Sequence, residues 1–143
     1  MGDQSRERRP GGKRALVEAF DSFGGDALRD VWLFDQKGHE SMYLRADVER
    51  KIDDIDVSTF VDNERYGYVT RDTYADLHYT SYEYTVRGFE GYEQFRTFLT
   101  NGEAKVGIFA SFDRRDGGYD FGQLQESIAT VVADYPIEDF VPE

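Results

Sequence analysis

Cysteine is absent from this 143-residue chain, and its absence excludes several kinds of chemistry. Without a thiol there is no disulfide, no thiol nucleophile and no thiolate ligand for zinc or an iron–sulfur cluster. Long apolar runs are missing as well: the longest spans residues 31–34, whereas a membrane-crossing helix needs about 20 apolar residues. The length fits one domain, which is large enough to bury a hydrophobic core without disulfides or structural metal ions.

Positive charge is scarce, because 17 Lys and Arg residues stand against 29 Asp and Glu residues and give a net charge of −12. Five of the basic residues lie within the first 14, beside only two acids, so the rest of the chain carries −15. Such a body repels phosphates and anionic membrane surfaces, which need neutralising cations. We therefore expect no nucleic-acid partner and no membrane partner.

Lysine and the large aliphatic residues are also few, with 4 Lys, 7 Leu and 5 Ile against 17 Asp. This composition is typical of proteins from extreme halophiles, because molar salt shortens the Debye length to about 3 Å and screens acidic self-repulsion. An acidic mesophilic protein is the alternative. Arg8 and Arg9 resemble a twin-arginine signal, but no apolar stretch follows them. Without a targeting segment we expect a cytoplasmic protein.

The N-terminal part divides into a tail and the start of a folded domain. Residues 1–13 are basic and end near Pro10-Gly11-Gly12, which predicts a disordered tail before a single domain over residues 14–143. A first helix is expected from near Lys13 to Gly24-Gly25, since Leu16, Val17, Phe20 and Phe23 share one face. Residues 31–34 then predict a central strand, and residues 41–44 predict its hairpin partner after a turn at 36–39.

A second helical region is expected over residues 47–65. Asp47 is placed to cap it, and the acidic residues 53–56 predict an interruption. Its expected buried residues are Val48, Ile52, Phe60 and Val61. Residues 66–80, rich in Tyr and Asp, show no clear periodicity, and we expect a loop with room for one short helix.

Residues 82–112 predict a three-stranded meander. Runs at 82–89, 92–100 and 103–112 are separated by Glu90-Gly91 and Asn101-Gly102, and Asn-Gly is a strong hairpin signal. Two-residue turns fix the register, which places Val86 opposite Phe95, Phe95 opposite Ile108 and Thr97 opposite Val106. The face that results is the expected core, formed by Tyr82, Tyr84, Val86, Phe95, Thr97, Leu99, Val106, Ile108 and Ala110.

A last helix follows, capped by Asp120 with Gln123 and ended by Tyr135-Pro136. The predicted fold class is therefore α+β, with the order α-β-β-α-β-β-β-α and a mainly antiparallel five-stranded sheet against which the helices pack. This layout resembles the roadblock/longin, profilin-like and PAS/GAF-type folds. That resemblance implies the strand order 2-1-5-4-3. The first and fifth strands, which contain the apolar residues 31–34 and 106–109, would then lie at the centre of the sheet.

Three segments carry a closer resemblance: residues 42–47, 61–65 and 84–87. They are similar to a family of small acidic haloarchaeal proteins of unknown function, over roughly residues 14–134. The resemblance supports the halophile interpretation. It implies no catalytic residues, because none are established for that family.

The search for catalytic and metal-binding patterns finds none. Asp54, Asp56 and Ser58 begin like a calcium loop, but Thr59 replaces the required glycine and Arg65 the bidentate acid. Asp113 and Asp116 are the other weak cation candidates. The two histidines, His39 and His78, have no nucleophile or ligand pattern beside them. We expect a protein that is not an enzyme, with no catalytic residue, metal or cofactor.

The other face of the predicted meander mixes arginine with aromatic residues, which are enriched at protein interfaces. We call the following six residues the candidate patch: Arg87, Phe89, Tyr92, Arg96, Phe98 and Phe109. The patch predicts an interaction or scaffold module that forms a homodimer or binds a protein partner. Two alternatives stay open. Residues 47–65 could cover this face, or the protein could sense a small ligand in an aromatic pocket between sheet and helices.

Overall fold

A computed structural model describes residues 10–52, 57–67, 71–73, 77, 82–101 and 104–143. Its elements alternate helices with hairpins in the predicted order, and the second helical region consists of two helices. The elements are α2 (Gly11–Gly24), η1 (Gly25–Ala27), β1 (Leu28–Phe34), β2 (His39–Leu44), α3 (Ala46–Ile52), α4 (Val57–Arg65), β3 (Tyr84–Phe89), β4 (Tyr92–Asn101), β5 (Ala104–Asp113), α6 (Phe121–Asp134) and η2 (Ile137–Phe140).

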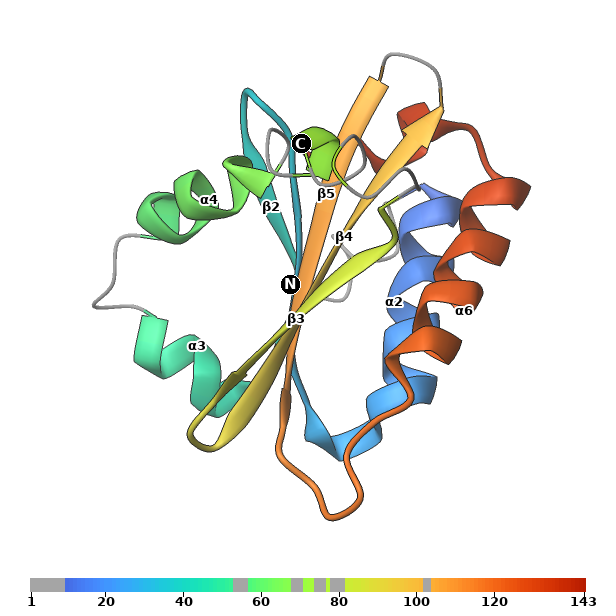
Figure 1. Cartoon of the computed structure of the whole chain (residues 1–143). Coiled ribbons are helices and arrows are strands. Elements are labelled where there is room, and N and C mark those ends of the chain that lie inside the picture. The colour runs from blue at the N-terminus through green and yellow to red at the C-terminus, as the bar shows by residue number, and fades with distance from the viewer. Residues whose placement is uncertain (1–9, 53–56, 68–70, 74–76, 78–81, 102–103) are drawn as a thin grey trace.

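The five strands form one antiparallel sheet in the order β2-β1-β5-β4-β3. The predicted fold class and strand order are therefore confirmed. Figure 1 shows three layers, with α2 and α6 on one side of the sheet and α3 and α4 on the other. We call the side under α2 and α6 the first face and the side under α3 and α4 the second face.

The first face holds most of the core. Phe20, Phe95 and Leu124 are fully buried there, and burial of a side chain of this size stabilises the fold by about 1.5–3 kcal/mol. Aromatic rings stack between sheet and helices, with 5.8 Å between the ring centroids of Phe95 and Phe121. Gly24 lets α2 approach, because a Cβ there would lie 2.7 Å from the Phe112 ring.

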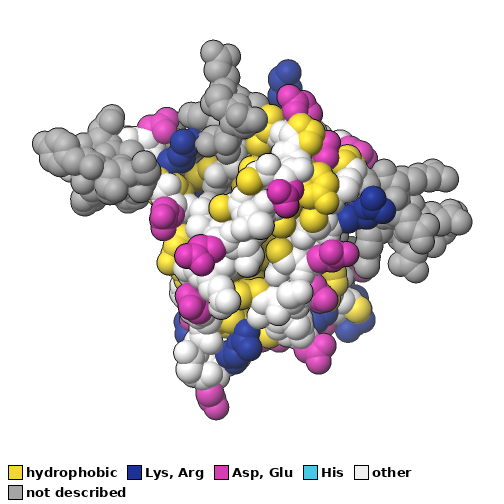
Figure 2. Space-filling view, turned by 90° about the vertical axis from the view of Figure 1, so that its right-hand side faces the viewer, with side chains coloured by type: hydrophobic (Ala, Val, Ile, Leu, Met, Phe, Trp, Pro, Cys, Tyr) yellow, Lys and Arg dark blue, Asp and Glu magenta, His cyan; other side chains and the backbone are white. Residues whose placement is uncertain are grey.

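The second face has a smaller core of Trp32, Phe34, Val61 and Phe109, with four partly buried residues around it: Leu44, Ile52, Val57 and Phe98. Helices α3 and α4 therefore cover part of this face. Figure 2 shows the outer side of the layer formed by α2 and α6. Acidic side chains are scattered over it, and hydrophobic side chains form only interrupted areas.

The register of the meander confirms one hairpin and corrects the other. Val86 pairs with Phe95 as predicted, but Phe95 pairs with Ala110 and Thr97 with Ile108. The predicted pairs Phe95–Ile108 and Thr97–Val106 are wrong, because the last pair of the hairpin is Asn101–Ala104. The error is a shift of two residues, which leaves every side chain on its predicted face.

Three side chains expected in the core lie elsewhere. Tyr82 precedes β3, and its ring packs 6.0 Å from that of Phe98 on the second face. Val86 is 38% exposed because β3 is the edge of the sheet. Phe60 is 45% exposed. The sheet-facing positions of α4 are instead Val61 and Glu64, which are both buried.

The helix ends also differ in part from prediction. Helix α2 begins at Gly11, and Lys13 is buried with its Nζ donating to Glu40 Oε1 at 2.8 Å. Asp47 lies inside the first turn of α3 and does not precede it, a position where the helix dipole also favours an acid. Asp120 caps α6 as predicted, since its side chain accepts from the Gln123 amide.

Candidate functional site

The structure divides the candidate patch into two groups. Arg96 and Phe109 are buried, and Phe98 is partly buried beneath the α3 and α4 layer. Phe89 is 41% exposed at the β3–β4 turn, where its ring stacks on Tyr92 with 5.1 Å between centroids. The sequence correctly placed the six residues on one face. It did not show which of them a helix covers.

A buried carboxylate joins the two arginines of the patch to α4. Glu64 is 2% exposed, and it accepts from Arg87 Nη1 and Nη2 at 2.8 and 2.7 Å and from Arg96 Nη1 at 3.1 Å. We call these three residues the Glu64 cluster. Because a buried carboxylate is costly without cations, this cluster fixes where α4 lies on the sheet.

Further polar contacts hold the end of α4 to the β1–β2 turn. Arg65 donates from Nε to the Asp35 carbonyl at 2.8 Å and from Nη2 to the Gly38 carbonyl at 3.3 Å. Just beyond the helix, a Cβ on Gly67 would lie 2.7 Å from the Arg96 guanidinium. The contact between α4 and the sheet therefore combines buried Val61 and partly buried Val57 with a larger set of hydrogen bonds from charged side chains.

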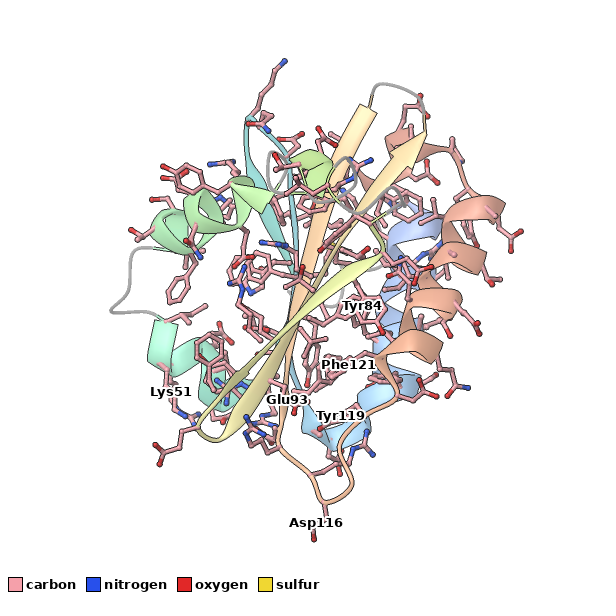
Figure 3. The ribbon with its side chains drawn as sticks, viewed as in Figure 1. Lys51, Tyr84, Glu93, Asp116, Tyr119 and Phe121 are labelled. Carbon is pink, nitrogen blue, oxygen red and sulfur yellow. The ribbon has the colours of Figure 1, made fainter. Side chains whose placement is uncertain are left out.

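A cavity of about 540 Å³ lies between the second face and the helices α3 and α4. Its lining combines apolar side chains with polar and charged ones from both the sheet and the helices. The lining residues are Arg29, Asp30, Trp32, Val48, Lys51, Ile52, Val57, Phe60, Glu90, Gly91, Tyr92, Gln94, Phe109 and Ser111. Figure 3 shows Lys51 on the α3 side of the sheet, opposite Tyr84, Tyr119 and Phe121 on the α6 side.

The sheet register arranges the floor of this cavity in two cross-strand rows. Trp32 pairs with Phe109, and their rings are nearly parallel, with 9° between planes and 6.1 Å between centroids. One step along the strands, Asp30 pairs with Ser111 and Ser111 pairs with Gln94. The floor therefore holds a stacked aromatic pair beside a row of hydrogen-bonding side chains.

Asp30 is the carboxylate of the cavity floor. Its Oδ1 accepts from the Ser111 amide and from the Ser111 hydroxyl, each at 2.8 Å. Burial raises the pKa of Asp30 above its ordinary value, although hydrogen bonds from Ser111 and Trp32 oppose the shift. Arg29 Nε donates to Ser111 Oγ at 3.1 Å, so the serine links a guanidinium to this carboxylate.

A second charge cluster joins the start of α3 to the end of β5. Arg45 donates to Asp113 at 2.6 and 3.1 Å and to Asp47 at 2.6 and 3.0 Å. These hydrogen bonds lower the pKa of Asp113, lower that of Asp47 to about 2, and raise that of Arg45. Both carboxylate oxygens of Asp113, one of the two weak cation candidates in the sequence, therefore accept hydrogen bonds from Arg45.

The remaining candidate residues are placed as follows. His39 lies in β2, not in the predicted turn, and its ring is 6.0 Å from that of Trp32. His78 and the acids Asp54 and Asp56 lie outside the described residues. Within the described part of the chain no group of three or more His, Asp or Glu side chains could hold a metal ion. No helix there has the length and apolarity to cross a membrane.

Comparison with known proteins identifies the family. Residues 14–133 match the family described as Domain of unknown function (DUF7522). The chain belongs to this family. Its match covers nearly the same span as the resemblance that the sequence motifs carry, and the expected family of unknown function is thereby confirmed. No curated protein matches the chain.

A solved structure shares the fold. Myxococcus xanthus MglB is similar with a TM-score of 0.57 and 14% sequence identity, over 94% of this chain and 96% of that one. The likeness confirms the roadblock/longin layout, one of the folds suggested by the order of the elements. At this identity it shows the fold alone.

Proposed function

We propose that this protein is a non-enzymatic interaction module that self-associates through the outer edge of β3 and the exposed part of the candidate patch. The observation that carries the proposal is the position of β3 at the end of the sheet. An edge strand directs every second pair of N–H and C=O groups away from its neighbour, where another strand can pair with them. No strand in the described residues occupies that side of β3.

The composition of β3 favours pairing. Natural edge strands are often blocked by charged side chains, proline or a bulge. Strand β3 has no proline and pairs with β4 without interruption, and its one charged side chain, Arg87, is paired with Glu64. Val86 and Phe89 are 38% and 41% exposed on it. Apolar side chains on an unprotected edge are typical of a surface that another chain covers.

The other edge of the sheet differs. On β2, Glu40 accepts from buried Lys13 at 2.8 Å and from the amide of Glu143 at 3.1 Å. The start of α2 and the end of the chain therefore meet at β2. Of the two edges, β3 is the one that offers apolar side chains next to its backbone groups.

The fold agrees with this proposal, since roadblock/longin-like folds often mediate protein interactions. A second copy is the simplest partner, because a two-fold axis lets β3 pair antiparallel with itself. Val86 lies near the middle of the strand and would then approach its own copy. Phe89, Tyr92 and Arg87 would extend the contact beyond the backbone hydrogen bonds.

The test is the molar mass in solution. Light scattering in concentrated KCl should give twice the chain mass of 16.5 kDa for the wild type and the chain mass for Val86→Lys, which places a charge on the edge. Val141→Lys is the matched control, since Val141 is 39% exposed but lies near the C-terminus, and it should remain dimeric. A monomeric wild type, or a Val86→Lys dimer with wild-type circular dichroism, would overturn the proposal.

A further inference from the structure

The charged residues that line the second-face cavity balance each other. Arg29 and Lys51 carry positive charge, whereas Asp30 and Glu90 carry negative charge. The volume of the cavity is about 540 Å³, which lies within the range of small-molecule sites, about 300–1,000 Å³. Such a lining favours a ligand that bears both charges and has no net charge, because a buried charge needs a partner of the opposite sign.

Asp30 has no cationic partner among the described residues, since none of their ion pairs includes it. Its carboxylate has hydrogen bonds from the Ser111 amide, the Ser111 hydroxyl and the Trp32 side chain. Burial still raises the pKa of Asp30, because desolvation of its charge outweighs these hydrogen bonds. An ionised carboxylate accepts about four hydrogen bonds, so Asp30 can accept one more, and a cationic donor would also compensate its charge.

Arg29 supplies the opposite charge close to Asp30. Its Nε donates to Ser111 Oγ at 3.1 Å, and the same hydroxyl donates to Asp30 Oδ1 at 2.8 Å. A single hydroxyl therefore separates the guanidinium from the carboxylate. Arg29 Nη1 lies 3.6 Å from Asp113, whereas Nη2 has no acceptor among the described residues. Nη2 is the group that can donate to a carboxylate on a ligand.

The helices give the cavity its apolar contacts. Ile52 lines the cavity from α3, and Val57 and Phe60 line it from α4. Phe60 is 45% exposed, so part of its ring is open to a ligand, whereas Trp32 and Phe109 are buried beneath the helical layer. An apolar group on the ligand would therefore pack against the helix side of the cavity.

We propose that the second-face cavity binds a free α-amino acid with an apolar side chain, such as phenylalanine. The ligand's ammonium group donates to Asp30, and its carboxylate accepts from Arg29. These two groups share one carbon atom, which suits two opposite charges that a single hydroxyl separates. The ligand's side chain packs against Ile52, Val57 and Phe60. This site does not use the edge of β3, and it goes beyond the interaction role.

The test compares L-phenylalanine with two analogues that each lack one charge. Phenethylamine lacks the carboxylate and hydrocinnamate lacks the ammonium group, while all three contain the phenyl ring. Trp32 is the only tryptophan of the chain and its side chain is hydrogen-bonded to Asp30, so its emission reports a ligand at that carboxylate. In concentrated KCl the emission change should saturate with L-phenylalanine, with a Kd below about 1 mM. Each analogue should bind the wild type at least tenfold more weakly, because it leaves one charged group of the site without its partner.

Two charge variants assign the groups of the ligand. Asp30→Asn keeps an oxygen acceptor for Ser111, and it should weaken L-phenylalanine at least tenfold without weakening hydrocinnamate. Arg29→Gln should weaken L-phenylalanine at least tenfold without weakening phenethylamine. Lys51→Gln is the matched control, because it removes the same charge from an exposed position of the lining, and it should leave the affinity for L-phenylalanine unchanged.

The proposal fails if L-phenylalanine gives no saturable change in emission, or if either analogue binds the wild type as tightly. It also fails if a folded Asp30→Asn binds L-phenylalanine with wild-type affinity, or if Lys51→Gln weakens it as much as Arg29→Gln does. Circular dichroism identifies a misfolded variant, and the comparison of the three ligands on the wild type then decides.

Discussion

Both faces of the sheet carry a pair of helices, but the two contacts differ in kind. On the first face, fully buried side chains such as Leu16, Phe20 and Phe95 form the contact between the sheet and the helices. On the second face, four buried residues share the contact with the Glu64 cluster, the hydrogen bonds of Arg65 and a cavity. We therefore expect the second-face layer to open more readily than the first-face core, because regions with few buried apolar contacts open first.

The largest expected effect is on the first face. Phe95 is fully buried and its ring lies within 6.3 Å of those of Phe20, Tyr84 and Phe121. Phe95→Ala should lower the free energy of unfolding by about 3–5 kcal/mol, because it leaves a cavity that the sheet cannot close. Urea unfolding followed by far-UV circular dichroism measures this value. A loss below about 1 kcal/mol would mean that the first face is not the main support.

A smaller and more local effect is expected on the second face. Glu64→Gln keeps the shape of the side chain but removes the charge that Arg87 and Arg96 share, and hydrogen bonds to charged groups contribute about 1.5–3 kcal/mol. We expect a loss near the lower end of this range, because Arg87 retains 31% exposure.

The location of that loss distinguishes the two faces. In Glu64→Gln, Trp32 emission should shift to the red at a lower urea concentration than the far-UV signal changes, since α4 separates from the sheet first. Glu83→Gln, at an exposed position just before β3, serves as the control and should leave both transitions unchanged. Coincident transitions in Glu64→Gln would show that α4 and the rest of the fold unfold together.

The sequence predicted the first face well because its signals there are local and strong. The Asp120 cap, the two-residue turn after Phe89 and the alternation along β4 and β5 each act over a few residues. The one register error came from taking Asn101-Gly102 as the turn. The error did not change which face each side chain was assigned to, because a shift of two residues preserves the alternation of side chains between the faces.

The second face could not be read in the same way. The burial of Arg96 and Phe109 depends on how α4 is rotated, and that rotation follows from the pairing of Glu64 with arginines on distant strands. The sequence did contain one indication of this pairing. Arg87 and Arg96 lie on a half-apolar face, and arginines that a helix buries there need an acidic side chain from that helix. The cavity depends on the distance of α3 and α4 from the sheet, which no local pattern encodes.

Native-state hydrogen exchange tests the central claim, that the second-face layer opens independently of the first-face core. The amides in the last turn of α4 should exchange through openings of clearly lower free energy than those of α6 and the central strands β1 and β5, because regions with few buried apolar contacts open first. The same free energy of opening for α4, α6 and the central strands would contradict the claim, since the two faces would then form one cooperative unit.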